Sequence, residues 1–320
     1  MFTIQSTKTV LFGPGITKAL PNSVASTLGR RVLVVTDAAI RHLGLVDPFL
    51  AALRSAGVEL TIFDGVLPEP PRENVEAAAA IARNIAATGI VGFGGGSAMD
   101  VAKVVALLGG GGKTLDDVFG VELAAGPRLP LVLIPTTAGT GSETTPVAIL
   151  VAGPVKKAVV SRHLLPDIAI LDPELSISLP RGVTAATGID AMVHAIEAFA
   201  SASPNRNPIS QGAAKQALRL LGANLRRVVE DGSDSEGGGA MLLGSFLAGQ
   251  AFANSPVAAV HALAYPIGGR FHIAHGVSTA LMLTHVMRFN LPVAASEYAA
   301  SPATSFPVLR RSPKTGALKR

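Results

Sequence analysis

Two halves of different periodicity constrain the fold of this chain more than any other feature. Up to about residue 178, short apolar runs such as residues 31–36 (RVLVVT) and 129–134 (LPLVLI) alternate with helical patterns. Strands that alternate with helices predict a parallel sheet with helices on both faces. After residue 178 the strand signals stop, and only helical patterns follow. We therefore expect an α/β domain over residues 1–178 and an all-α domain over residues 179–298.

The expected elements can be placed along the chain from these patterns. Strands are predicted at residues 31–36, 58–63, 90–93, 129–134 and 167–171, and helices of the second domain at residues 190–200, 211–230, 239–253 and from 257 onward. The segment 231–239 (DGSDSEGGG) predicts a flexible surface turn between two of these helices.

The composition limits what the chain can hold. With 320 residues, 48% of them hydrophobic and 15% charged, the chain can bury a large core in two domains. Cysteine is absent, so disulfides and thiolate metal ligands are excluded. Any bound metal must therefore be held by histidines and carboxylates.

The charge pattern argues against a nucleic-acid partner. Residues 301–320 carry five of the 27 Lys and Arg and none of the 22 Asp and Glu, so 22 basic and 22 acidic residues remain in the other 300. A basic tail is not the basic stripe that a phosphate backbone needs, and a chain with no Trp and two Tyr offers little to stack on bases. The most apolar stretch, residues 241–266, is interrupted by polar residues, so we expect no membrane span and a cytoplasmic protein.

A run of glycines marks the end of the third predicted strand. Residues 94–97 (GGGS) follow the strand and open a helix, where free N–H groups and the positive end of the helix dipole can hold a phosphate. The spacing is not that of the GxGxxG fingerprint. Taken alone, the glycines indicate a plain tight turn between a strand and a helix more often than a phosphate site.

Two further polar clusters stand at strand ends. The fourth predicted strand runs into residues 135–143 (PTTAGTGSE), whose hydroxyls and glycines suit the ligand-binding crevice of an open α/β sheet. Asp37 ends the first predicted strand, where a carboxylate can accept hydrogen bonds from a ribose and repel a 2′-phosphate; it can equally cap the next helix. Three clusters at three strand ends favour a nucleotide site.

Four residues of the helical half form a candidate metal site. Asp190 and His194 are four residues apart and share one face of a predicted helix, and His261 and His275 lie near Gly or Pro. Three histidines and one carboxylate suit a divalent first-row metal such as Fe²⁺ or Zn²⁺. Each histidine alone is compatible with a core position, but a buried Asp190 in an apolar helix is costly unless its charge is paired or coordinated.

At this point the sequence resembles the iron-containing (group III) alcohol dehydrogenases. The segments that carry the resemblance are residues 66–70 (VLPEP), 94–103 (GGGSAMDVAK), 135–143 (PTTAGTGSE), 165–173 (LPDIAILDP), 188–197 (GIDAMVHAIE) and 261–276 (HALAYPIGGRFHIAHG). They cover the chain from about residue 8 to 290 in the expected order. The resemblance implies a dehydroquinate synthase-like architecture, an N-terminal dinucleotide-binding domain and a helical domain with the metal in the cleft between them.

The resemblance also implies a role for single positions. The metal ligands would be Asp190, His194, His261 and His275; the pyrophosphate would lie on Gly95, Gly96 and Ser97; the cofactor would run along Thr136, Thr137 and Thr140; Asp37 would select NAD; and Lys156 would lie on the nicotinamide side of the cleft. Many members have a second histidine four residues after the one matched by His261, and here that position is Tyr265. Tyr265 and His272 are the candidates for the proton relay, and the choice between them stays open.

The resemblance implies metal-dependent hydride transfer between NAD(H) and a small alcohol, aldehyde or ketone, in a homodimer. Maleylacetate reductase and hydroxyacid-oxoacid transhydrogenase are alternatives within the family, although Asp190 argues against the first. A lyase of the dehydroquinate synthase type would need a glutamate ligand that the sequence lacks. An inactive, nucleotide-binding remnant is the alternative outside enzymes.

The last residues depart from the family pattern. Residues 299–320 form an atypical basic tail with prolines at 302, 307 and 313, where family members continue with helices. From this pattern we expect a truncated or frame-shifted C-terminal region and a marginal or inactive product.

Overall fold

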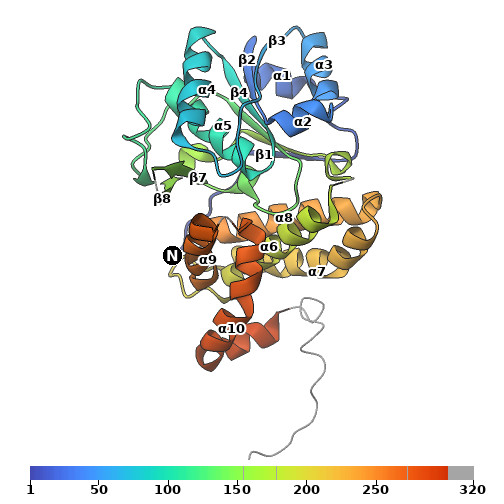
Figure 1. The fold of residues 1–320 in the computed structure, drawn as a ribbon, viewed down its shortest axis with the longest axis vertical. Helices are drawn as coiled ribbons and strands as arrows, with labels where there is room; N and C mark the ends of the chain where they lie inside the picture. Colours follow the sequence, from blue (N-terminus) through green and yellow to red (C-terminus); the bar gives the residue numbers. More distant parts are fainter. Residues whose placement is uncertain (154, 178, 272, 302–320) are drawn as a thin grey trace, which may run out of the picture.

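The computed structural model describes residues 1–153, 155–177, 179–271 and 273–301. Figure 1 shows an α/β layer above a layer of helices, with the sheet in the upper layer. His272 and residues 302–320, and with them nearly all of the predicted tail, lie outside the described residues.

A six-stranded sheet forms the centre of the α/β layer. Its order is β1-β9-β6-β4-β2-β3, and all of its paired strands are parallel. The prediction of a parallel sheet is therefore confirmed. The strands are β1 (Thr9–Phe12), β2 (Arg31–Val35), β3 (Glu59–Phe63), β4 (Gly89–Gly94), β6 (Leu131–Pro135) and β9 (Ile168–Leu171). All of them except β1 were expected from the sequence.

Helices cover both faces of this sheet because its strands are apolar on both sides. In β2, Val32 and Val34 pack in a core with the helices α1 to α3, and Leu33 and Val35 pack in a second core with α4 and α5. The helices are α1 (Asn22–Leu28), α2 (Ala38–His42), α3 (Asp47–Ser55), α4 (Arg72–Asn84) and α5 (Gly96–Gly109). Side chains alternate along a strand, so a run of β-branched residues serves both cores.

A second, three-stranded sheet lies beside α5 and was not expected. It contains β5 (Gly120–Val121), β7 (Val147–Ala152) and β8 (Val155–Val160) in the order β5-β8-β7, with β7 and β8 antiparallel. Only every second residue of β7 is fully buried. This sheet forms one wall of the cavity described below.

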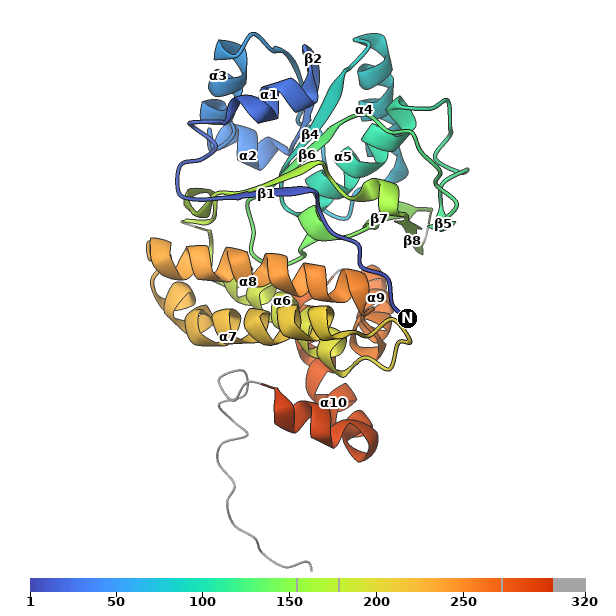
Figure 2. The ribbon, with the colours of Figure 1, turned by 180° about the vertical axis from the view of Figure 1, so that it is seen from behind.

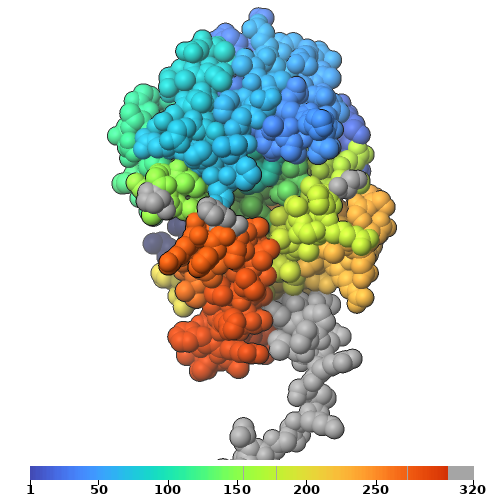
Figure 3. All heavy atoms as spheres, in the orientation of Figure 1, coloured from blue at the N-terminus to red at the C-terminus, as the bar shows by residue number. Residues whose placement is uncertain are grey.

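The lower layer is helical, as the sequence predicts, and contains five described helices. They are α6 (Arg181–Ala200), α7 (Pro208–Glu230), α8 (Ser235–Asn254), α9 (Ala259–Phe271) and α10 (His275–Ala300). Figure 3 shows α9 and α10 as an orange and red lobe at the lower end of the molecule. No helix in the described ranges is both long and apolar enough to cross a membrane.

The prediction of a turn over residues 231–239 was wrong in its second half. Helix α8 begins at Ser235, and Asp234 caps it by accepting a hydrogen bond from the Gly237 N–H at 2.9 Å. The three glycines at 237–239 are buried in the first turns of the helix. A side chain at Gly237 would come within 2.7 Å of Val228, so close packing against α7 outweighs the poor helix propensity of glycine.

The segment of residues 3–7 joins the two layers. The Thr3 N–H donates to Asn205 at 2.8 Å, Gln5 exchanges two hydrogen bonds with the side chain of Asn254, and the Thr7 hydroxyl donates to the Glu143 carbonyl at 3.0 Å. Figure 2 shows the amino terminus beside the helical layer and the following chain entering β1.

Candidate active site

Two loops meet where β4 and β6 end. The glycine loop (residues 94–97) opens α5, and the threonine loop (residues 135–143) follows β6. The Thr136 N–H donates to the Gly94 carbonyl at 3.0 Å, and a side chain on Gly96 would come within 2.8 Å of Thr140. Gly96 is therefore required by the close approach of the two loops, and the φ of 149° at Gly94 favours glycine at the turn. The structure brings Gly95, Gly96 and Ser97 beside Thr137 and Thr140, at the carboxyl edge of the sheet where such folds bind ligands.

Asp37 lies at the end of β2, beside the glycine loop. One of its carboxylate oxygens accepts a hydrogen bond from the Ile40 N–H at 2.9 Å and caps α2. The other faces Gly94, 3.4 Å from where a side-chain carbon would stand. The capping role is thus present. The role in selecting NAD stays a prediction, and the second oxygen leaves room for it.

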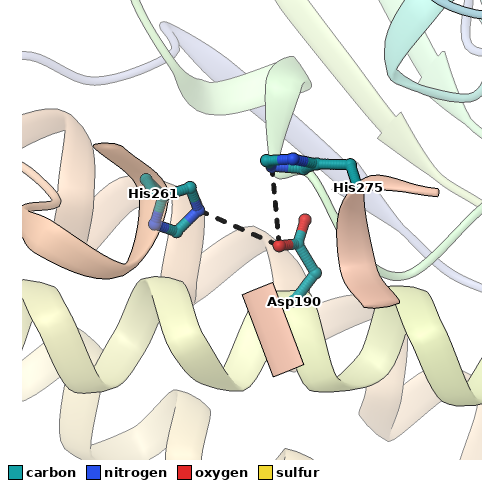
Figure 4. A group of neighbouring side chains, drawn as sticks. All are labelled: Asp190, His261 and His275. Carbon is teal, nitrogen blue, oxygen red and sulfur yellow. Dashed lines mark ion pairs between the residues drawn. The ribbon is translucent and has the colours of Figure 1, made fainter. Parts of the chain in front are cut away.

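Asp190, His261 and His275 come together from three helices, α6, α9 and α10. Figure 4 shows the two imidazole rings facing the carboxylate of Asp190. The Asp190 Oδ1 atom lies 3.8 Å from the Nε2 atom of His261 and 3.7 Å from that of His275. One ligand atom from each residue lies within 4.8 Å of those of the other two. These separations suit three donors around a single ion.

His194 lies next to this group on the same face of α6 as Asp190. Its ring stacks on that of His261 with centroids 4.5 Å apart, and on Phe252 on the other side at 4.6 Å. Burial lowers the pKa of His194 to about 3, so the ring is neutral and a nitrogen lone pair is available. Its place among the metal ligands stays a prediction.

Glu197 holds His261 in place and was not assigned from the sequence. Its two carboxylate oxygens accept hydrogen bonds from the Val260 N–H at 2.8 Å and from the Nδ1 atom of His261 at 2.5 Å. A proton on Nδ1 leaves Nε2, which faces Asp190, as the lone-pair donor. The signal was present in the spacing, because Glu197 follows Asp190 by seven residues on an apolar helix and so shares its face.

The polar atoms of this group fit a divalent ion. Within the described part of the chain, the buried Nε2 atom of His261 has no hydrogen-bond partner. The Thr279 hydroxyl donates to the Oδ1 atom of Asp190 at 3.0 Å and orients the carboxylate. Burial would raise the pKa of Asp190, but the surrounding histidines lower it below its ordinary value, so the group is anionic. One carboxylate with neutral imidazoles is a donor set for a first-row metal.

The metal group and the two loops line one cavity of about 420 Å³, which we call the central cavity. From the upper layer it is lined by Gly96, Ser97 and Thr140, and from the lower layer by Asp190, His194, His261, Tyr265 and His275. Apolar residues, among them Val257 and Phe252, form much of the remaining wall. A nucleotide on the loops and a small molecule at the metal group would therefore share one space.

Lys156 and Tyr265 both line the central cavity. The Lys156 ammonium forms an ion pair with Glu69 at 2.5 Å. The Tyr265 ring stacks on His275 with centroids 5.7 Å apart, and burial together with nearby carboxylates raises the pKa of Tyr265 to about 12. The hydroxyl is therefore protonated at neutral pH and can donate a hydrogen bond. The other relay candidate, His272, lies outside the described residues.

A buried lysine links the two loops behind the cavity wall. Lys103 is fully buried, and its ammonium donates to the Ser142 hydroxyl at 2.7 Å, the Thr145 hydroxyl at 3.2 Å and the Val147 carbonyl at 2.9 Å. The Ser142 hydroxyl in turn donates to Asp100 at 2.6 Å. Asp100 and Ser142 line the central cavity, and neither was assigned a role from the sequence. Their pairing explains why the GGGSAMDVAK and PTTAGTGSE segments carry these charged and hydroxyl residues.

Glu143 gives a prediction about pH. It is 1% exposed, one of its oxygens has no hydrogen-bond partner among the described residues, and burial raises its pKa from 4.5 to about 7. The folded protein therefore binds the proton more tightly than the unfolded chain, and stability falls as the pH rises from about 5 to 7. Between pH 5 and 7, the free energy of unfolding of the wild type should fall by about 2–3 kcal/mol more than that of Glu143→Gln. Chemical unfolding of both proteins at pH 5 and 7 measures the difference. Equal pH dependence would contradict the prediction.

Comparisons with known proteins agree with this geometry. The family model described as iron-containing alcohol dehydrogenase matches residues 7–173, and the model of the C-terminal part of the same family matches residues 184–304. The chain belongs to the iron-containing alcohol dehydrogenase family. The resemblance drawn from the sequence motifs and the fold that it implied are confirmed.

Relatives in this iron-containing alcohol dehydrogenase family act on several alcohols and aldehydes. Long-chain-alcohol dehydrogenase 1 of Geobacillus thermodenitrificans is 46% identical over 263 residues, 81% of this chain and 66% of its own length. The crystal structure of a 1,3-propanediol oxidoreductase has a TM-score of 0.91 and 38% identity, over 95% of this chain and 80% of that one. The sulfoacetaldehyde reductase of Bifidobacterium kashiwanohense, solved with NAD⁺, has a TM-score of 0.83 and 32% identity, over 91% and 77%. The chain spans just under two thirds of the first of these relatives.

Proposed function

We propose that the chain is an NAD-dependent, metal-assisted alcohol dehydrogenase that interconverts a small alcohol and its aldehyde or ketone. The observation that carries the proposal is the central cavity, because the start of α5 and the group Asp190, His261 and His275 line the same space. A fold with a nucleotide site on one wall and a metal site on the other suits hydride transfer between a nicotinamide and a metal-held oxygen function.

The proposed division of labour follows the two layers, residues 1–178 and 179–298. The N–H groups at the start of α5 would hold the cofactor pyrophosphate, with Gly95, Gly96 and Ser97 close to it. The threonines 136, 137 and 140 would lie along the cofactor, and Asp37 would prefer NAD to NADP. The relative solved with NAD⁺ supports the choice of cofactor.

Asp190, His194, His261 and His275 would hold the metal, Fe²⁺ or Zn²⁺. When bound, the ion would supply a Lewis acid that polarises the substrate oxygen. The protein orients the reactants and excludes water, because the surrounding wall is apolar and Asp190, His194 and His261 are buried. The protonated hydroxyl of Tyr265 can donate a hydrogen bond into the cavity. We further propose a cytoplasmic homodimer without nucleic-acid or membrane partners.

The test is NADH formation with a panel of small alcohols, on metal-stripped protein to which Fe²⁺ or Zn²⁺ is returned. We expect turnover to depend on the metal and to fall at least about 100-fold in His275→Ala. Loss of a hydrogen-bond partner of a metal ligand already lowers activity up to about 100-fold, and here the ligand itself is removed. Metal-independent turnover, or a His275→Ala variant with full rate and metal content, contradicts the proposal. A folded protein that binds NADH without any turnover points to a nucleotide-binding remnant instead.

A further inference from the structure

An ion pair lies on the wall of the central cavity, beside the metal group. The Lys156 ammonium is 2.5 Å from the Glu69 carboxylate, and the two side chains are 15% and 37% exposed. A side-chain carbon on Gly268 would stand 3.9 Å from the Lys156 ammonium, so the pair faces α9, the helix that carries His261. A substrate at the metal group would therefore contact or approach both charges.

The backbone holds the carboxylate in this position. Val151 lies opposite Lys156 in the β7–β8 pair, and its N–H donates to the Pro70 carbonyl at 2.9 Å. Glu69, which precedes Pro70, is therefore held beside β7, the strand that pairs with β8 and its Lys156. Glu69 itself has a φ of 51°, in a region that favours glycine, and it precedes a proline. The loop keeps a charged side chain at a backbone position where glycine would cost less.

The pair changes what the cavity can recognise. Lys156 is the one Lys or Arg among the described residues that line the central cavity, and it is paired with Glu69. Among the described lining residues, therefore, no Lys or Arg is left without a carboxylate partner. Apolar residues of the same cavity include Val151, Phe252 and Val257.

We propose that Glu69 is a specificity-determining residue: it neutralises Lys156 and restricts the cavity to alcohols and carbonyl compounds without an anionic group. This inference rests on the proposed function, which defines the substrates as small alcohols, aldehydes and ketones. Without the carboxylate, the same ammonium would face the cavity as a free cation and would favour carboxylated or sulfonated aldehydes.

Binding to the full chain without metal tests the inference apart from catalysis. Butyrate and butyramide have the same shape and differ in charge. We expect Glu69→Gln to lower the dissociation constant for butyrate about tenfold, since one partly exposed charge is unmasked, and to leave butyramide unchanged. Glu73→Gln is the matched control, because Glu73 is an exposed carboxylate at the start of α4 outside the cavity lining. The double variant Glu69→Gln/Lys156→Gln should return butyrate to its wild-type affinity.

Measurements of turnover provide a second, independent test of the role of Glu69. With metal and NADH present, the ratio of kcat/KM for sulfoacetaldehyde to that for propanal should rise about tenfold in Glu69→Gln. An unchanged butyrate affinity in Glu69→Gln, or a gain that survives in the double variant, overturns the inference. Absence of turnover in every variant contradicts the proposed function instead, and the butyrate comparison still decides the role of Glu69.

Discussion

Replacing Gly276 by alanine should separate α10 from α6 and destroy the metal group. A side-chain carbon at Gly276 would stand 2.2 Å from the Ala186 carbonyl oxygen, a backbone atom that cannot rotate away. Helix α10 must then shift by about 1 Å or more to reach van der Waals distance. His275 precedes Gly276 directly, and metal–ligand distances tolerate only about 0.2 Å. We expect metal affinity to fall at least about 100-fold, with a loss of stability of about 1–3 kcal/mol.

Metal affinity by competition with a chelator and chemical unfolding measure the two effects. The matched control is Gly212→Ala in α7, where no described atom outside the helix's own backbone stands within 4 Å of the added carbon. That change should leave metal affinity unaltered and add up to about 1 kcal/mol of stability through helix propensity. A Gly276→Ala protein with wild-type metal affinity would show that the contact between α6 and α10 does not position His275.

Replacing Glu197 by glutamine should weaken metal binding about 10–100-fold, although the shape of the side chain is kept. The carboxylate accepts from two donors, the Val260 N–H and the ring of His261, and a glutamine has a single acceptor oxygen. If that oxygen stays on the Val260 N–H, the amide donates to Nδ1 and the proton of the imidazole moves to Nε2. The Nε2 atom, which faces Asp190, then has no lone pair to donate to a metal.

Nitrogen NMR of the histidine rings in metal-free protein reads the tautomer directly. Wild type should show His261 protonated on Nδ1, and Glu197→Gln should show a shift toward Nε2, in parallel with the lower metal affinity. Glu236→Gln, an exposed carboxylate on α8, serves as the control and should change neither. A glutamine variant with the wild-type tautomer and affinity would assign Glu197 to packing alone.

The parallel sheet could be predicted because its strands are buried on both faces. Such strands appear as short continuous runs of β-branched residues, and residues 31–36 are an example. β7 (VAILVA) has an apolar run of the same kind but was not assigned as a strand from the sequence. β8 (VKKAVV) is interrupted by two lysines and is stabilised by pairing with β7. β1 is a four-residue edge strand with three exposed residues, and in the described part of the chain it pairs with β9 alone, more than 150 residues away. Strands defined by distant partners leave little local pattern.

For the site, too, local spacing could be predicted from the sequence, but contacts between distant elements could not. Helical spacing places Asp190 and His194 on one face, but a separation of fourteen residues between His261 and His275 fixes no geometry. The structure brings both histidines to Asp190 through the packing of α9 and α10 on α6. The same packing brings Glu197 to His261, and the hydrogen bond from Val151 of β7 to Pro70 brings Glu69 to Lys156. The distance along the sequence predicts neither contact. Pairings between charged residues on different elements are the part that required coordinates.

The hydrogen bonds of residues 3–7 bear on how the central cavity can open. The two layers are connected by the chain between β9 and α6, and also by the bonds of Thr3 and Gln5 to the helical layer and of Thr7 to the threonine loop. Gly141 of that loop packs directly on Gly249 of α8, which adds a further point of attachment. Bodies attached at several separated points cannot swing about one hinge. Movements that admit cofactor and substrate should therefore be small shears between packed helices.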